Sequence, residues 1–166
     1  AGDAQNASTD GEFKRDTKYI GDRIVASVTG DEPQPSSDNA GETLHWPVQP
    51  NRYRLVAARA CPWAHRAVIV RRLMGLEDVI SLGLAGPTHD KRSWTFDLDP
   101  GGLDPVLQIP RLQDAYFKRF PDYPRGITVP SIVEEASGKV VTNDYNSMVR
   151  DFQTQWTDYH LSLIHI

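Results

Sequence analysis

From residue 52 onward, hydrophobic and polar positions follow first a strand-like and then a helix-like pattern. Residues 52–58 predict a strand and residues 62–74 predict a helix. Pro62 suits the first position of that helix, where its missing amide hydrogen would be unpaired anyway, and Gly75 can end it. Residues 79–84 predict a second strand, parallel to the first, which completes a βαβ unit. The buried stripe of the helix is expected to consist of Ala64, Val68, Ile69 and Leu73.

The pattern after residue 84 predicts a long insertion and then a hairpin and a helix. The insertion, 85–126, is rich in proline, and residues 111–119 within it predict a helix. Residues 127–133 and 139–142 predict an antiparallel hairpin. Asn143 is expected to cap a last helix, whose apolar face contains Met148, Val149, Phe152 and Trp156. The order βαβ and then ββα is that of a thioredoxin-like α/β domain.

The first fifty residues are polar, and we expect them to add little to a hydrophobic core. Residues 29–42 have almost no apolar content and predict a flexible linker or exposed loop, whereas residues 11–15 and 19–28 could fold back onto the domain. We therefore predict a polar N-terminal extension over residues 1–50, a thioredoxin-like domain over 51–157, and a truncated linker or non-native tail over 158–166.

Charge and cysteine content narrow the class of protein. The formal net charge is −4, which argues against a nucleic-acid binder because such a protein needs a basic face. One cysteine cannot form an internal disulfide, and no segment approaches the roughly 18 apolar residues of a membrane span. The N-terminus does not look like a signal peptide. These features favour a cytoplasmic protein that binds neither nucleic acid nor membranes.

The single cysteine, Cys61, directly follows the first predicted strand and precedes Pro62. A thiol at the start of a helix faces unpaired backbone amides, and their partial positive charge favours the thiolate. Ala64 stands where a Cys-x-x-Cys motif has its second cysteine, so any disulfide formed at Cys61 must be broken by an external thiol. This predicts a low-molecular-weight thiol as co-substrate. The alternative is that Cys61 is a small buried hydrophobic residue.

Two aromatic residues, His65 and Trp94, each have two possible roles. His65 lies one helical turn beyond Cys61 and could support the thiolate, or it could be a hydrogen-bonded structural histidine. Trp94 could cover the thiol or belong to the core. The five histidines are dispersed and no glycine-rich phosphate loop is present, so we expect neither a metal site nor a bound cofactor.

Four segments resemble the glutathionyl-hydroquinone reductases, the xi class of glutathione transferases. They are 61–66 (Cys-Pro-Trp-Ala-His-Arg), which is the most specific, 75–78, 94–96 and 128–130. The resemblance runs from about residue 11 to residue 160, and it implies that an all-helical domain is missing, which in the family closes the quinone pocket and forms a homodimer. Two alternative functions remain open: an omega-like thioltransferase or dehydroascorbate reductase, and an inactive or non-catalytic fragment.

The resemblance implies a reaction and a site. In the family, the cysteine attacks the sulfur of a glutathionyl-hydroquinone, the hydroquinone leaves, and a second glutathione resolves the mixed disulfide; this role falls to Cys61. The implied thiol-binding residues are Trp94, Arg125, Val129, the cis-proline Pro130, Asp144 and Tyr145. Where the family commonly has Glu-Ser, this chain has Asp144-Tyr145, a form that resembles an actinobacterial branch. Organisms of that branch commonly use mycothiol, so the co-substrate is either glutathione or mycothiol.

Overall fold

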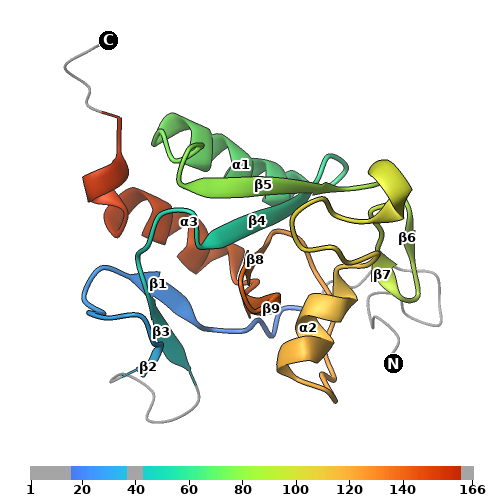
Figure 1. Cartoon of the computed structure of the whole chain (residues 1–166), viewed down its shortest axis with the longest axis horizontal. Coiled ribbons are helices and arrows are strands. Elements are labelled where there is room, and N and C mark those ends of the chain that lie inside the picture. The colour runs from blue at the N-terminus through green and yellow to red at the C-terminus, as the bar shows by residue number, and fades with distance from the viewer. Residues whose placement is uncertain (1–15, 37–42, 162–166) are drawn as a thin grey trace.

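The computed structural model describes residues 16–36 and 43–161, and its centre is a four-stranded mixed sheet (Figure 1). The strand order is β5-β4-β8-β9, with β4 parallel to β5 and antiparallel to β8. These strands are β4 (Tyr53–Ala58), β5 (Ile80–Ala85), β8 (Ser131–Glu134) and β9 (Lys139–Thr142). The predicted βαβ unit and the predicted hairpin are therefore confirmed, and the domain is thioredoxin-like.

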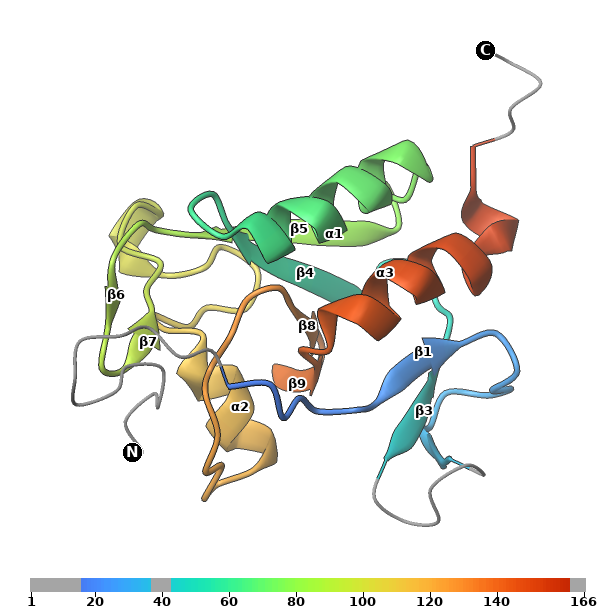
Figure 2. The same cartoon turned by 180° about the vertical axis from the view of Figure 1, so that it is seen from behind.

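Helices cover both faces of this sheet. Helices α1 (Pro62–Leu73) and α3 (Tyr145–Thr154) lie side by side on one face, and α2 (Gln113–Arg119) lies on the other (Figures 1 and 2). Successive side chains of a strand point to opposite faces, so the core divides in two. The cluster on the α1 and α3 face includes Leu55, Ile132, Val141, Ala67 and Phe152. The cluster on the α2 face includes Val56, Val133, Val140, Tyr116 and Cys61.

The buried face of α1 differs from the predicted stripe. Ala64 and Ala67 are fully buried, whereas Ile69 and Leu73 are 55% and 69% exposed. The prediction was wrong for these two residues because it assigned the largest apolar side chains to the core. The helix instead packs through small side chains, which let its axis approach the sheet closely. Arg71 completes the buried face, because its guanidinium donates to the main-chain oxygen of Ile80 at 2.7 Å.

The N-terminal extension forms a small sheet of its own. Strand β1 (Arg23–Val25) pairs in parallel with β3 (Leu44–Pro47), and β2 (Gln34–Pro35) pairs antiparallel with β3. Ile24 and Trp46 are buried in the core cluster that includes Phe152 of α3. The expectation that this region adds little to the core was wrong, because its few apolar residues face the domain. Residues 11–15 and 37–42, and the tail after residue 161, lie outside the described residues.

The long insertion is attached to the sheet by a buried ion pair. Arg54 of β4 donates to Asp104 at 3.0 Å, and the two side chains are only 6% and 0% exposed. Asp104 also accepts the main-chain N–H groups of Val106 and Leu107. The insertion contains β6 (His89–Asp90), β7 (Ser93–Trp94), the 3₁₀ turn η1 (Pro100–Gly102) and α2.

The chain beyond β9 turns directly into α3 and ends in the 3₁₀ turn η2 (Thr157–Tyr159). The N-cap of α3 is Asp144 and not the predicted Asn143, whose side chain points into the core. None of the helices in the described ranges has the length and apolarity needed to cross a bilayer.

Candidate functional site

Cys61 occupies the N-cap of α1 in an extended conformation, directly after the turn that leaves β4. Its N–H donates to the carbonyl of Ala58 at 3.1 Å, and its own carbonyl accepts the N–H of His65 at 3.0 Å. The thiol donates to the main-chain oxygen of Val129, with 3.4 Å between Sγ and oxygen, and the residue is 7% exposed. The predicted position of the thiol at a helix start is therefore confirmed.

Val129 belongs to a corner that leads into β8, and its peptide bond to Pro130 is cis, as the resemblance implied. A network of hydroxyl groups fixes this corner. The hydroxyls of Tyr116 and Ser131 both donate to the main-chain oxygen of Thr128, at 3.1 and 2.5 Å. Burial raises the pKa of Tyr116 to about 12, so its hydroxyl stays protonated and available as a donor. The Val129 carbonyl is thereby held in a defined position against Cys61.

The start of α3 contributes Asp144 and Tyr145 to the same region. The Asp144 carboxylate caps the helix by accepting the N–H groups of Asn146 and Ser147, at 3.1 and 3.4 Å. The ring of Tyr145 contacts the ring of Trp63, two residues after Cys61, with centroids 6.3 Å apart. Two helix starts that are far apart in sequence therefore meet beside the thiol.

Trp94 reaches this region from the insertion. It lies in β7, is half-buried, and packs against the core cluster that contains Cys61. Its ring contacts the ring of His89 edge-on at 4.7 Å, and its carbonyl accepts the N–H of Leu112 at 3.1 Å. Trp94 therefore belongs to the edge of the core around the thiol, a placement that is compatible with both interpretations of this residue.

His65 and Arg125, two of the predicted site residues, have exposed side chains. His65 is exposed on α1 and lines a pocket of about 220 Å³ with Arg59 and Leu82, and within the described ranges no hydrogen bond joins its ring to Cys61. Arg125 is exposed on the loop before the cis-proline corner. The neighbouring Gly126 donates its N–H to Asp16 at 3.1 Å.

Sequence reasoning missed the part played by Asn143. Its side chain is 1% exposed, and its amide accepts the N–H of Ile20 and donates to the hydroxyl of Thr128, each at 2.8 Å. The partners lie 123 and 15 residues away, so no local pattern signals this role. The ring contacts of Trp63 and Tyr19 with Tyr145 were missed for the same reason.

This chain is similar to several known proteins. The family model of the glutathione S-transferase N-terminal domain matches residues 60–155. The glutathione S-transferase omega-like 2 of Schizosaccharomyces pombe is 31% identical over 153 residues, covering 92% of this chain and 44% of that protein. The glutathionyl-hydroquinone reductase YqjG of Escherichia coli is 32% identical over 149 residues, covering 89% and 43%.

A solved structure is similar as well. The crystal structure of a glutathione transferase from Gordonia bronchialis has 62% sequence identity and a TM-score of 0.76, and the match covers 87% of this chain and 40% of that one. The chain thus spans less than half the length of the relatives it matches.

Proposed function

This chain belongs to the family of glutathione S-transferase N-terminal domains, and on that premise we propose that it is the thiol-binding half of a glutathionyl-hydroquinone reductase. The observation that carries the proposal is the placement of Cys61 at the N-cap of α1, beside the cis-proline corner. The unpaired amides of a first helical turn favour an anion at this position. Cys61 therefore acts as the nucleophile in the proposed reaction.

The proposed reaction has two steps that both pass through Cys61. The thiolate attacks the sulfur of a thiol-hydroquinone conjugate, a disulfide bond forms, and the carbon–sulfur bond to the ring breaks. The bonding electrons remain on the ring carbon, which takes up a proton, so the free hydroquinone leaves. A second small thiol attacks the mixed disulfide and releases the Cys61 thiolate. The sulfur of the conjugate and the sulfur of the second thiol thereby end in one disulfide, and the carbon–sulfur bond of the ring is reduced to carbon–hydrogen.

The remaining site residues bind the small thiol in this proposal. Its sulfur-bearing part lies along the backbone of Val129, which is already within hydrogen-bond distance of Sγ. If the thiol is glutathione, Asp144 offers a half-buried carboxylate to its ammonium group, and Trp94 and Tyr145 provide apolar walls. Arg125, exposed on its loop, would then interact with a carboxylate of glutathione.

The identity of the thiol and the assembly of the protein are part of the same proposal. Tyr145 stands next to Asp144, where the family that the sequence resembles commonly has a small serine, so we propose either glutathione or mycothiol as co-substrate. The acceptor is a quinone-derived conjugate, the location is the cytoplasm, and a longer form of the protein is a homodimer through a helical domain. The glutathionyl-hydroquinone reductase of Escherichia coli, which is 32% identical to this chain, supports the proposed class of reaction.

The test is the variant Cys61→Ser, compared with the wild-type chain. The wild type is exposed to glutathione disulfide and, separately, to mycothiol disulfide, and its mass is followed over time. We expect one thiol adduct on Cys61 and none on Cys61→Ser, and the disulfide that reacts faster identifies the thiol. Turnover of a glutathionyl-hydroquinone, measured with the helical domain present, should be lost in the same variant. A variant that keeps turnover would show that Cys61 is not the nucleophile.

A second function uses the same nucleophile on other acceptors. The relative from Schizosaccharomyces pombe is named omega-like, which favours a thioltransferase or dehydroascorbate reductase. The two functions are separated by the turnover rates of one protein with a glutathionyl-hydroquinone, a mixed disulfide and dehydroascorbate, measured in the same assay. Only the reductase prefers the glutathionyl-hydroquinone. A chain that forms no adduct with any of them would instead be an inactive fragment.

A further inference from the structure

Residues 16–22, which we call the strap, run past β9 and the start of α3 before they enter β1 (Figure 2). The strap is fixed at both of its ends. Asp16 accepts the N–H of Gly126 at 3.1 Å, and the buried Asp22 accepts the indole N–H of Trp46 at 2.8 Å. A change in the middle of the strap therefore leaves both of these anchors in place.

A chain of hydrogen bonds leads from the middle of the strap to the thiol. The hydroxyl of Thr142 donates to the carbonyl of Ile20 at 2.7 Å, and the N–H of Ile20 donates to Asn143 at 2.8 Å. Asn143 in turn donates to the hydroxyl of Thr128, the residue before Val129. The Val129 carbonyl accepts the thiol of Cys61. The strap is thus bonded to the corner that faces the nucleophile.

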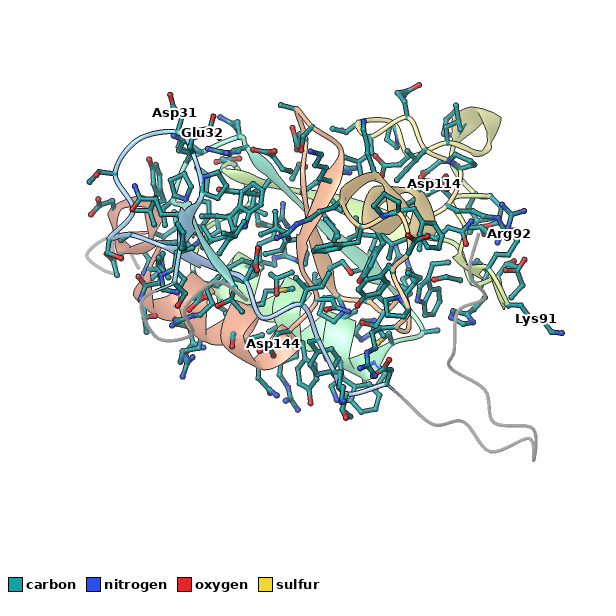
Figure 3. All side chains as sticks on the ribbon, turned by 90° about the horizontal axis from the view of Figure 1, so that it is seen from below. Asp31, Glu32, Lys91, Arg92, Asp114 and Asp144 are labelled. Carbon is teal, nitrogen blue, oxygen red and sulfur yellow. The ribbon has the colours of Figure 1, made fainter. Side chains whose placement is uncertain are left out.

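A series of ring contacts also joins the strap to Trp63, two residues after Cys61. The ring of Tyr19 meets the ring of Tyr145 at 5.8 Å with an interplanar angle of 76°, and Tyr145 meets Trp63 at 6.3 Å and 63°. All three residues are half-buried. Figure 3 shows the neighbouring Asp144 at the start of α3, next to the blue strap. Edge-to-face packing of this kind restricts the orientation of the central ring.

From these contacts we infer that the strap is part of the thiol site, and that Tyr19 is a positioning residue that orients Tyr145 for binding of a small thiol at Cys61. The inference rests on the proposed function, because it assigns a role to the wall of that site. Tyr19 acts through Tyr145 and not on the sulfur atoms. Its loss should therefore weaken binding of the thiol without slowing the exchange step at Cys61.

The experiment compares Tyr19→Ala with Tyr19→Phe in the full chain. Mixed-disulfide formation at Cys61 is measured against the concentration of glutathione disulfide or mycothiol disulfide, whichever gives a saturable adduct. The exchange transfers one thiol to Cys61 and releases the other as thiolate. In Tyr19→Ala we expect the half-saturating concentration to rise roughly three- to ten-fold, the size that one ring contact accounts for. Tyr19→Phe keeps the ring and should restore the wild-type value.

The matched control is Tyr159→Ala, which removes a half-buried ring that contacts Trp156 at 5.9 Å in another part of the domain. The half-saturating concentration of Tyr159→Ala should stay within about two-fold of the wild-type value, even if the midpoint of its unfolding in urea changes. Alkylation by iodoacetamide, a small neutral reagent, should proceed at similar rates in all variants.

The outcomes separate the inference from the proposed function. If the wild type forms a saturable adduct and Tyr19→Ala matches it within about two-fold, only the inference is overturned. The same holds if Tyr19→Ala and Tyr159→Ala raise the half-saturating concentration equally, since the effect then follows stability. If the wild type forms no adduct, the proposed function fails and the role of Tyr19 fails with it.

Discussion

The thiol of Cys61 donates a hydrogen bond to the main-chain oxygen of Val129 across 3.4 Å, although 68 residues separate the two in sequence. The contact joins the start of α1 to the corner before β8. Because Thr128 in this corner is bonded to Asn143, the position of the nucleophile depends on β9, α3 and the strap as well as on its own helix.

Replacing Asn143 with alanine should reduce the stability of the domain. The substitution removes the partner of the N–H of half-buried Ile20 and of the hydroxyl of buried Thr128. We expect the free energy of unfolding in urea to fall by about 2–3 kcal/mol, because unsatisfied buried polar groups keep their desolvation cost. The control is Asn146→Ala on the exposed side of α3, which should change it by less than about 0.5 kcal/mol. Equal effects would contradict the bridging role of Asn143.

Two substitutions of Asp144 separate its capping role from its proposed binding role. Asp144→Ala removes the acceptor of two helix N–H groups and should cost about 1 kcal/mol of unfolding free energy. Asp144→Ser retains a capping oxygen and should recover most of that loss. If the carboxylate also pairs with the thiol ligand, Asp144→Ser should still bind the ligand weakly in a saturation assay. Wild-type affinity in Asp144→Ser would show that Asp144 is a cap alone.

The ion pair between Arg23 of β1 and Asp151 of α3 should make stability depend on pH in the variant Arg23→Ala. Burial raises the pKa of Asp151, and the neighbouring Arg23 opposes that rise. Without the arginine, the buried carboxylate is unpaired at pH 7, and we expect a loss of about 1–3 kcal/mol, reduced from the fully buried case because Arg23 is 27% exposed.

The sign of the pH effect follows from the raised pKa of Asp151. A carboxyl group whose pKa is higher in the folded state than in the unfolded state binds a proton preferentially in the folded state. As the pH falls through that raised pKa, Asp151 becomes neutral and the cost of its unpaired charge disappears. The stability difference between wild type and Arg23→Ala should therefore shrink in acid, measured by urea unfolding at several pH values. A difference that is constant with pH would contradict this assignment.

The observed buried face of α1 predicts effects of different size for two positions on this helix. Leu73 is exposed, so Leu73→Lys should change the unfolding free energy by no more than about 0.5 kcal/mol. Ala67 is fully buried, so Ala67→Leu should cost about 1–3 kcal/mol through overpacking. The apolar stripe expected from sequence implies a severe loss for Leu73→Lys. Urea unfolding of the two variants distinguishes these expectations.

The elements whose signals are local could be predicted from the sequence. The strand over 52–58, the helix starting at Pro62 and the strand after Gly75 follow from periodicity, a helix-start proline and a glycine that can end a helix. The structure has β4, α1 and β5 there, with Gly75 at positive φ. The placement of Cys61 at a helix start came from the same local pattern. Such features can be predicted from sequence because each depends on residues within a few positions of one another.

Long-range contacts determine which face of α1 is buried, how Asn143 bridges the strap to Thr128, and how Tyr19 reaches Tyr145. The buried face of a helix depends on how closely its neighbours approach, and small residues such as Ala67 allow an approach that hydrophobicity alone does not predict. The partners of a buried amide are likewise chosen by which segments the fold brings together, over separations of up to 123 residues here. Hydrogen bonds and packing contacts between residues so far apart in sequence leave no periodic pattern in the sequence. Their energy is gained only after the domain has folded.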